Sequence, residues 1–399
     1  MRFCKRFWKN LYMPPAYPKT DILLAYKEVM TQENAGAVSK VVANLWKYSA
    51  HRDALTVFGV PITQVPLDNV NFHPLPIRMP WLYGKNRGFL KAYLAHLKNN
   101  PWQTPELVEI HSRCHLAREM KIARPDVAVS LYMHNDARMM RGGKTAGERV
   151  WLIENLDAIL FVSDYLRQGF IKDLPVDRLA SDISAKCRVI GNELTRVVKK
   201  RPRKKKTIIL AGRMVAEKGI LEACQAAARI LPNFPDWHLH IVGGRHFQKS
   251  ALSAYEKSVQ DALLPIRSQS TQHGFMKGAD LAILQAEASI ALVPSLWDDP
   301  APLAVLEALL HGCALLTTDK GGIPETATGR AEIAAIGQLG IASDVDREKI
   351  IDRFARKLQD LLAHPETVRQ LQDKAWHDFP FDARNMAVNA DKYRLCVKS

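Results

Sequence analysis

Two carboxylates and a helix start make residues 299–307 a candidate for chemistry. Asp299 and Glu307 lie on either side of Pro302, which suits a first helical turn because its missing N–H would have no partner there. Leucines recur at helical spacing from Leu303 onward and predict a helix over 303–310 with one buried face. A helix start presents free N–H groups that bind phosphate or a polar ligand. The segment therefore fits either a ligand site or a capped helix with a surface glutamate.

Two cations follow a predicted strand near the middle of the chain. Gly212 and Arg213 come directly after the strand predicted at 207–211, and Lys218 precedes the next predicted helix. Glycine lets the backbone approach a ligand closely, while the planar fork of Arg and the point charge of Lys both suit a diphosphate. The alternative is a glycine turn with two surface cations.

A glycine pair, Gly321-Gly322, follows the strand predicted at 314–317. Successive backbone N–H groups in such a turn can form an anion-binding nest. The alternative is an ordinary turn between a strand and a helix.

Two further patterns lack the surroundings that their chemistry needs. Gly143-Lys144-Thr145 resembles the end of a phosphate-binding P-loop, but Arg138 stands where the first glycine is required. His111 and His115 have the i, i+4 spacing of metal ligands, but no acidic third ligand or CxxC pair supports them. The sequence therefore does not favour a P-loop or a metal site.

The elements that must position these residues alternate between strands and helices. Strands are predicted at residues 22–25, 55–60, 127–133, 159–162, 189–190, 207–211, 237–242, 289–293 and 314–317. Helices are predicted at 38–48, 107–122, 219–231, 279–285 and 303–310, while 61–105 have no clear period and are expected to wrap the surface. This alternation predicts an α/β protein with two doubly wound domains, whose ligands bind at the carboxyl ends of the strands.

The composition is that of a globular protein without disulfides or a zinc ribbon. The 399 residues are 47% hydrophobic, and the six cysteines are scattered without a CxxC pair. No apolar run approaches the ~18 residues that span a bilayer, and the first residues lack the apolar core of a signal peptide. These observations predict a cytoplasmic protein.

The formal net charge of +15 favours an anionic partner, which could be nucleic acid, anionic lipid or a phosphorylated substrate. The densest basic run, 196–206, fits a nucleic-acid patch or a solvated linker between domains, and the strand directly after it favours the linker. Residues 1–11 mix aromatic and basic side chains. They fit a basic amphipathic helix at a membrane surface or a frayed start.

Taken together, these segments resemble the retaining GT-B glycosyltransferases of family 4, the glycosyl transferases group 1. The resemblance is strongest over 207–328, in the order of five motifs: Gly-Arg to Glu-Lys-Gly (212–219), His-Ile-Val-Gly-Gly (240–244), His-Gly-Phe (273–275), Asp299 to Glu307, and Gly-Gly-Ile-Pro-Glu (321–325). The first half matches more loosely, through Asn34-Ala35-Gly36, the strand ending at His134, Ser163 and Asn192.

This resemblance implies a GT-B fold of two Rossmann-like domains that face a cleft. Residues 1–198, joined by a returning helix at 380–399, would bind the acceptor, and 199–379 would bind the nucleotide sugar. The implied activity is metal-independent and needs no cofactor. It transfers a hexosyl group with retention to a glycan or lipid-linked acceptor, in bacterial cell-surface polysaccharide or lipopolysaccharide assembly. The protein would lie in the cytoplasm, with a possible peripheral site on the inner face of the membrane.

The resemblance also implies roles for individual residues. Arg213 and Lys218 would neutralise the leaving diphosphate, His134 would lie near the transferred sugar, and Asp299 would bind the sugar hydroxyls. Binding of the nucleotide sugar would involve the loops and helix of the cleft, at Gly36, Gly212, Gly243, Phe275, Leu303, Glu307, Gly321 and Gly322.

The sequence departs from the usual pattern at three places. Asp299 stands where the family usually has Glu, Glu193 follows Asn192 in place of Gly, and Ala35 replaces the first glycine of a pair. Two alternatives to an active transferase therefore stay open. One is a weak or inactive protein that binds a nucleotide sugar as a scaffold or sensor, and the other is a basic nucleic-acid-binding protein.

Overall fold

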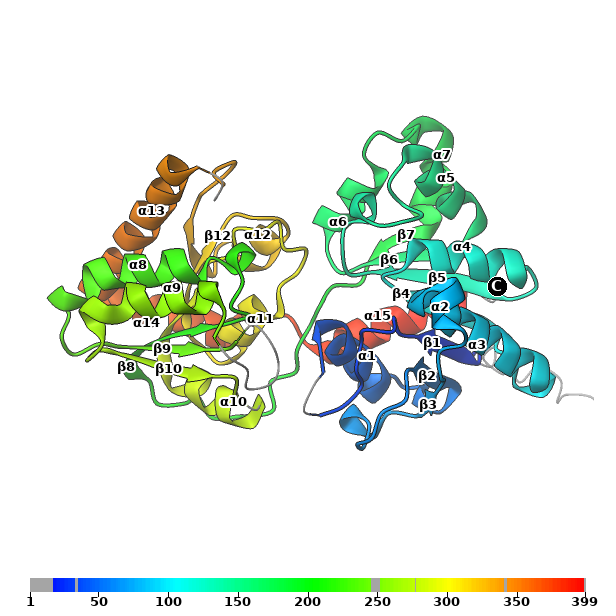
Figure 1. The fold of residues 1–399 in the computed structure, drawn as a ribbon, viewed down its shortest axis with the longest axis horizontal. Helices are drawn as coiled ribbons and strands as arrows, with labels where there is room; N and C mark the ends of the chain where they lie inside the picture. The colour runs from blue at the N-terminus through cyan, green and yellow to red at the C-terminus, as the bar shows by residue number, and fades with distance from the viewer. Residues whose placement is uncertain (1–16, 33–34, 245–251, 277, 341–342, 398–399) are drawn as a thin grey trace, which may run out of the picture.

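The computed structural model describes residues 17–32, 35–244, 252–276, 278–340 and 343–397. Figure 1 shows two lobes, each built on one sheet with helices around it, joined by extended chain. All strand pairs in both sheets are parallel. Parallel pairing requires crossover helices, which cover the faces of the sheet.

The first lobe holds a sheet of seven strands in the order β3-β2-β1-β4-β5-β6-β7 among the described residues. Its strands are β1 (Thr20–Leu23), β2 (Leu55–Gly59), β3 (Phe72–Pro74), β4 (Leu107–His111), β5 (Ala128–Met133), β6 (Ala158–Phe161) and β7 (Cys187–Val189). Its helices are α1 (Ala37–Tyr48), α2 (Pro80–Tyr83), α3 (Lys85–Asn99), α4 (Cys114–Ala123), α5 (Ala146–Asn155), α6 (Asp164–Ile171) and α7 (Val176–Lys186).

The second lobe holds a sheet of six strands in the order β10-β9-β8-β11-β12-β13 among the described residues. Its strands are β8 (Lys205–Ala211), β9 (His238–Val242), β10 (Ser270–Gly274), β11 (Ala288–Val293), β12 (Ala314–Thr318) and β13 (Ala331–Ala334). Its helices are α8 (Ile220–Ile230), α9 (Ala254–Leu263), α10 (Gly278–Glu287), α11 (Leu303–Leu310), α12 (Ile323–Ala327), α13 (Asp344–Ala363) and α14 (Pro365–His377).

Each sheet separates two apolar cores, which explains why its strands read as continuous apolar runs. In β8, Ile208 and Leu210 belong to one core, while Ile209 belongs to the core on the other face. The same alternation occurs in the first lobe, where Ile22 and Leu23 of β1 face opposite cores. Burial on both faces is typical of parallel sheets.

The last helix, α15 (Ala383–Cys396), returns from the second lobe to the first (Figure 1). It packs against α1, and three of its side chains, Ala383, Met386 and Ala390, are buried in the core of the first lobe. The strand order of each sheet reverses between two neighbours, β1 and β4 in the first lobe and β8 and β11 in the second. Such switch points leave a crevice at the carboxyl ends of the strands, where ligands bind.

Two predictions of secondary structure were wrong. Residues 107–122 are not one helix, because β4 occupies Leu107–His111 and α4 begins at Cys114. The sequence pattern did not indicate β4, because the strand contains the polar residues Glu109 and His111. Both are fully buried in the structure. Residues 61–105 do not merely wrap the surface, because they contain β3, α2 and the long helix α3.

The basic run 196–206 joins the two lobes, as the linker interpretation predicted, but part of it is anchored rather than solvated. The Arg196 guanidinium donates to the carbonyl of Leu310 at 2.9 Å and to that of Ala375 at 3.0 Å. The Lys204 ammonium donates to the carbonyls of Ala286 and His311 at 2.9 and 2.7 Å. These carbonyls lie at or near the ends of α10, α11 and α14, where helices favour cations.

The described residues contain no helix that is both long enough and apolar enough to cross a bilayer. The aromatic and basic segment at the N-terminus, predicted as a membrane-surface helix or a frayed start, lies outside the described residues.

Candidate active site

Two adjoining cavities lie between the lobes at the carboxyl ends of both sheets. The first has a volume of about 440 Å³ and the second about 420 Å³. They share part of their lining, including Arg213 and Leu303 from the second lobe and Ala37 from the first. Together they form one cleft with Arg213 at the junction of its two halves.

The first cavity gathers most of the residues predicted to bind the nucleotide part of a sugar donor. Its lining includes Gly36 from the loop before α1, the strand-end residues Gly212, Gly243 and Phe275, and Leu303 and Glu307 from α11. Met276 and Leu281 complete an apolar wall in the second lobe. An apolar slot with a few polar groups at its rim is the usual form of a small-molecule site.

Gly243 is required by the close approach of two loops at this cavity. Its φ is +135°, and a Cβ there would lie 1.8 Å from the carbonyl oxygen of Gly212. Its backbone N–H donates to the carbonyl of Gly274 at 2.8 Å. A side chain at this position would both strain the backbone and push apart the loops that follow β8 and β9.

Glu307 forms an ion pair across the cleft. Its Oε1 lies 3.4 Å from Nζ of Lys40, which belongs to α1 of the first lobe. The Glu307 side chain is 23% exposed, so the carboxylate faces the cavity from the side of α11. A ligand hydroxyl that binds Glu307 must therefore share the Glu307 carboxylate with Lys40 or displace the Lys40 ammonium.

The second cavity brings the two residues predicted at the transferred sugar, His134 and Asp299, together with Lys218, which is predicted at the diphosphate. Its lining includes His134 and Asn192 from the first lobe and Lys218 and Asp299 from the second. Nδ2 of Asn192 donates to the carbonyl of Ala301 at 2.9 Å, which ties the lobes together beside the cavity. Its Oδ1 is buried and accepts no hydrogen bond from the described residues.

Lys218 and Asp299 are paired with each other rather than with separate groups. The Lys218 ammonium donates to Oδ2 of Asp299, and only 14% of the Asp299 side chain is exposed. Backbone N–H groups of Leu296 and Trp297 donate to the carbonyl of Glu217 at 2.9 and 3.1 Å. These bonds hold the loop of Asp299 against the turn that carries Lys218.

The side chain of Arg213 is exposed and has neither a hydrogen-bond nor an ion-pair partner in the described part of the chain. It is therefore a free guanidinium at the junction of the two cavities. A planar cation with several donors in this position suits a phosphate group.

His134 lies at the carboxyl end of β5 and is almost fully buried. Burial lowers its pKa well below the ordinary histidine value, and the neighbouring His111 lowers it further. His134 is therefore a neutral imidazole at neutral pH, able to form hydrogen bonds but carrying no charge. His111, set aside above as half of a metal pair, instead bonds to His134 with an N–N distance of 2.8 Å.

Gly321 and Gly322 lie next to Asp299 and outside the lining of the two cavities. Gly321 has a φ of +58°, and a Cβ on it would lie 2.4 Å from the carbonyl oxygen of Asp299. Its N–H donates to Oδ1 of Asp298 at 3.2 Å, and that of Gly322 to the carbonyl of Asp299 at 2.9 Å. In this structure the turn supports the Asp299 loop, and contact with a phosphate stays a prediction.

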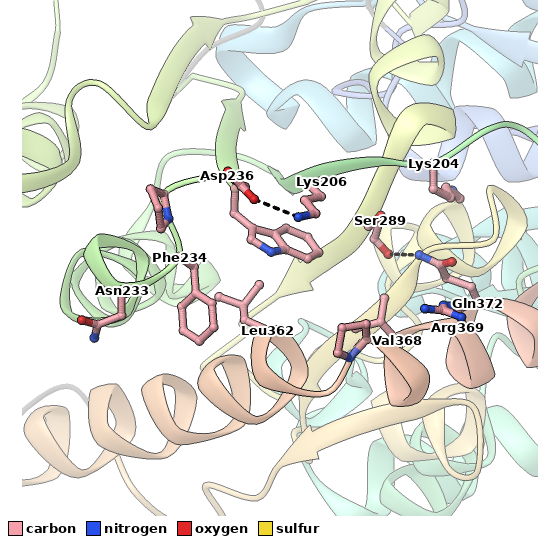
Figure 2. A pocket seen from close by; sticks show the side chains of 13 residues that line it. Lys204, Lys206, Asn233, Phe234, Asp236, Ser289, Leu362, Val368, Arg369 and Gln372 are labelled. Atoms are coloured by element: carbon pink, nitrogen blue, oxygen red, sulfur yellow. Dashed lines mark hydrogen bonds and ion pairs between the residues drawn. The ribbon is translucent and has the colours of Figure 1, made fainter.

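A cavity of about 470 Å³ lies elsewhere, near the amino ends of β8, β9 and β11. Figure 2 shows Lys206 directed at Asp236 and Ser289 bonded to Gln372. The Lys204 ammonium points away to helix-end carbonyls, as described above. Lys204 and Lys206 of this cavity are already bonded to other groups of the protein. The cavity also lies at the amino ends of the strands, whereas ligands bind at the carboxyl ends, so it is not the candidate site.

The structure thus places ten of the twelve predicted site residues on the two cavities, and Gly321 and Gly322 behind them. Sequence reasoning missed Lys40 and the contact of His111 with His134. No local signal marks Lys40 on α1. The buried polar residue His111 could have been found only by recognising β4 as a strand.

Comparisons with known proteins agree with this geometry. Residues 191–377 match the family model described as glycosyl transferases group 1. The YtcC protein of Bacillus subtilis is 25% identical over 307 residues, covering 72% of this chain and 71% of its own length. A lipopolysaccharide 1,2-N-acetylglucosaminetransferase of Salmonella typhimurium is 23% identical over 285 residues, covering 68% of each chain.

The Anabaena protein HepE, solved in complex with UDP-glucose, has the same architecture. It superimposes with a TM-score of 0.69 over 94% of this chain and 99% of its own, at 13% sequence identity. A structural match at this low sequence identity shows the fold alone. The chain therefore has the GT-B fold, and its residues 191–377 match the glycosyl transferases group 1, which supports a glycosyltransferase.

Proposed function

We propose that this protein is a retaining, metal-independent glycosyltransferase that moves a hexosyl group from a nucleoside-diphosphate sugar to a glycan or lipid-linked acceptor. The observation that carries the proposal is the unpaired Arg213 at the junction of an apolar cavity and a polar one. A nucleotide sugar has the same order of parts, with an aromatic base at one end, a diphosphate in the middle and a sugar at the other.

The nucleoside part would occupy the first cavity. Phe275 and the backbone at Gly243 would hold the base, and Glu307 would accept hydrogen bonds from the ribose hydroxyls. HepE is described in complex with UDP-glucose, which supports a sugar donor of this class. Binding of the ribose would separate Glu307 from Lys40, whose ammonium would then be free to approach the diphosphate.

The diphosphate would lie against Arg213 and Lys218. At ~4 Å and an effective dielectric of about 20, each such contact contributes about 4 kcal/mol before desolvation. The charge on the diphosphate grows as the glycosidic bond breaks, so these cations stabilise the transition state more than the bound substrate. We infer that they replace a metal ion and that no cofactor is needed. The Gly321–Gly322 turn would add N–H donors if Asp298 moves aside.

The sugar would occupy the second cavity, between His134 and Asp299. When the diphosphate takes over Lys218, the Asp299 carboxylate becomes free to accept hydrogen bonds from sugar hydroxyls. An acceptor would enter from the first lobe, near Asn192, and attack from the side of the leaving group, so that configuration at the anomeric carbon is retained. Residues 199–379 would thus bind the sugar donor, and 1–198 with 380–399 the acceptor.

The acceptor belongs, in this proposal, to bacterial cell-surface polysaccharide or lipopolysaccharide assembly. The Salmonella relative named above is a lipopolysaccharide enzyme, which supports this assignment. We propose that the protein works in the cytoplasm as a peripheral protein on the inner face of the membrane, where lipid-linked acceptors are found.

The first lobe carries an apolar and basic surface that suits anionic lipid. Met79, Trp81 and Leu82 are exposed by 46%, 79% and 53% at the start of α2. Lys85, Lys91 and Lys98 follow on α3, together with Arg78 just ahead of α2. Exposed aromatic and apolar side chains beside cations are typical of proteins that bind the membrane interface.

Sedimentation with vesicles tests the membrane assignment. We expect the protein to sediment with vesicles of phosphatidylcholine and phosphatidylglycerol, to stay in solution with phosphatidylcholine alone, and to bind less as salt rises. Trp81→Ser should weaken binding several-fold. Leu264→Ser is the control, because Leu264 is 63% exposed in the second lobe, directly after α9. Equal loss in both variants would contradict the assignment.

A thermal-shift panel tests the proposed function. Uridine, guanosine and adenosine diphosphates and their sugars are added in turn, and we expect one base to raise the melting temperature. Glu307→Ala should abolish most of that rise. Transfer is then measured with the sugar that binds and a bacterial membrane extract as the source of acceptor. No rise with any nucleotide, together with no effect of Glu307→Ala, would overturn the proposal.

The two alternatives give different results in the same experiments. A scaffold or sensor protein would be stabilised by a nucleotide sugar but would transfer nothing to any acceptor. A nucleic-acid-binding protein would bind through the 196–206 run with an affinity that falls steeply with salt and does not depend on Glu307. The internal contacts of Arg196 and Lys204 favour the transferase over this last possibility.

A further inference from the structure

A chain of buried polar side chains runs from α15 through β4 to the cleft. The Arg394 guanidinium donates to Oε1 of Glu109 at 3.0 Å and to Oε2 at 3.2 Å. Oε1 of Glu109 lies 3.0 Å from Nε2 of His111. Nδ1 of His111 lies 2.8 Å from Nε2 of His134, whose side chain lines the second cavity.

Glu109 is an ionised carboxylate at the inner end of this chain. Burial alone would raise its pKa, but Arg394 and the hydrogen bond from His111 outweigh burial and lower it to about 2. Arg394 is itself held by Asp391, which accepts from Nη1 at 3.3 Å. An ionised carboxylate can only accept hydrogen bonds, so it sets the direction of every bond that follows.

The direction can be traced atom by atom. Because Glu109 only accepts, Nε2 of His111 must carry a hydrogen. A His111 imidazole that carries only this hydrogen has an acceptor at its other nitrogen, so its Nδ1 would accept from Nε2–H of His134. Nδ1 of neutral His134 is left with a free lone pair. It has no hydrogen-bond partner in the part of the chain that the structure describes.

The rings are also fixed in orientation. Tyr132 stacks on His111 with ring centroids 4.9 Å apart and planes 11° apart, and on His134 at 4.9 Å and 14°. The backbone N–H of His134 donates to Oγ of Ser112 at 3.1 Å. The charged groups that face His134 are Glu109 and Arg113 in the first lobe and Arg213, Glu217, Lys218 and Asp299 across the cavity.

We propose that Glu109 and His111 are positioning residues that hold His134 as the Nε2–H tautomer, so that its Nδ1 accepts a hydrogen bond from a hydroxyl of the transferred sugar. The second half of this statement rests on the proposed function. An acceptor nitrogen favours a substituent that can donate, such as a hydroxyl, and rejects one that can only accept, such as the carboxylate of a uronic acid. The Glu109–His111 pair would thus help to select the sugar donor.

Nitrogen NMR of the full-length protein tests the tautomer directly. Protein labelled with ¹⁵N histidine gives one long-range spectrum of each imidazole, and the signals of His134 are found by their loss in His134→Gln. We expect Nε2 of His134 to show the shift of a protonated nitrogen and Nδ1 that of an unprotonated one. A wild-type spectrum with the hydrogen on Nδ1 would overturn the proposal.

His111→Phe keeps an aromatic ring beside Tyr132 but removes both hydrogen bonds of His111. We expect His134 to lose its preference for the Nε2–H tautomer in this variant. Glu109→Gln, which keeps the shape of the side chain, is expected to weaken the preference as well. A His134 spectrum unchanged by both substitutions would show that the pair does not position it.

The same samples separate this inference from the proposed function. Melting temperatures are measured with and without uridine, guanosine and adenosine diphosphates. Because these ligands lack the sugar, we expect His111→Phe to keep the stabilisation seen in wild type. Stabilisation together with a wild-type Nδ1–H tautomer overturns the inference alone. Absence of any stabilisation in wild type overturns the proposed function and with it the role assigned to Nδ1.

Discussion

At the scale of single residues, the cleft holds two of its lysines in ion pairs with carboxylates. Lys218 is bound to Asp299 and Lys40 to Glu307, while Arg213 stays free between them. In the proposed function, a diphosphate bound to Arg213 would compete with Asp299 for the Lys218 ammonium. The released Asp299 carboxylate would then face the sugar, so that binding of one part of the ligand would prepare the site for the other.

This exchange predicts opposite effects of one substitution on two ligands. Asp299→Ala removes the anion that competes for Lys218, so the nucleoside diphosphate should bind as tightly as in wild type or more tightly. The nucleotide sugar loses hydrogen bonds to a charged group, which are worth about 1.5–3 kcal/mol, and should bind about 10–100-fold more weakly relative to the diphosphate. Isothermal titration with both ligands measures the ratio.

Asp299→Glu is the matched control for this prediction. It keeps the charge and adds one methylene, so it should leave the ratio within a few-fold of wild type. A ratio that is unchanged in Asp299→Ala would contradict the assignment of Asp299 to the sugar.

At the scale of elements, local patterns predicted most strands and helices, but contacts between distant segments determined the rest. The helix at 303–310 is predictable because three local signals agree: the spacing of its leucines, Pro302 at its start and Gly312 just after its end. Strand β4 could not be predicted in this way, because Glu109 interrupts its apolar run. Glu109 is stabilised inside the strand by Arg394, which lies 285 residues away in the sequence. Sequence reasoning could find the site residues on strand-end loops, but not the partner that each one has.

The contact between Glu193 and α15 is expected to contribute to stability in a pH-dependent way. Burial raises the pKa of Glu193 to about 7, from an ordinary value of 4.5, although the N–H of Met386 donates to it at 3.0 Å. The folded state then binds more protons than the unfolded state between these values, so the contribution to stability is complete below pH 4.5 and is lost as pH rises through about 7.

Glu193→Gln stays neutral, and its amide oxygen can still accept from Met386. We expect the urea midpoint of this variant to fall less than that of wild type between about pH 5 and pH 8. Asp261→Asn, at an exposed site on α9, is the control and should follow wild type. Parallel pH profiles for wild type and Glu193→Gln would contradict the prediction.

The buried contact of Arg394 with Glu109 is expected to stabilise the packing of α15 on the first lobe. Arg394→Met leaves the fully buried Glu109 without its charge partner, which should cost about 3–5 kcal/mol in the free energy of unfolding. Arg356→Met, at an exposed site on α13, should change it by less than about 0.5 kcal/mol. Urea unfolding measures both. A loss below about 1 kcal/mol for Arg394→Met would show that the buried pair contributes little.

At the scale of the whole molecule, the cleft forms because the strands of both sheets end toward the same space. Glu325 of α12 accepts hydrogen bonds from the backbone N–H groups of Asp164 and Tyr165 at 2.9 and 2.5 Å, and so joins the second lobe to the start of α6. The returning α15 adds a second covalent connection between the lobes. The alternation of strands and helices predicted two such domains, but only the structure shows which loops face each other.

In the proposed function the cleft binds a nucleoside diphosphate through Arg213, and a comparison of two arginines tests this most directly. Arg213→Ala and Arg203→Ala each remove an exposed arginine, one at the junction of the cavities and one in the linker. The rise in melting temperature is measured for wild type and both variants with the nucleoside diphosphate that stabilises wild type most. We expect all three proteins to melt alike without ligand, and Arg213→Ala alone to lose most of the rise. An equal rise in all three proteins would contradict the account.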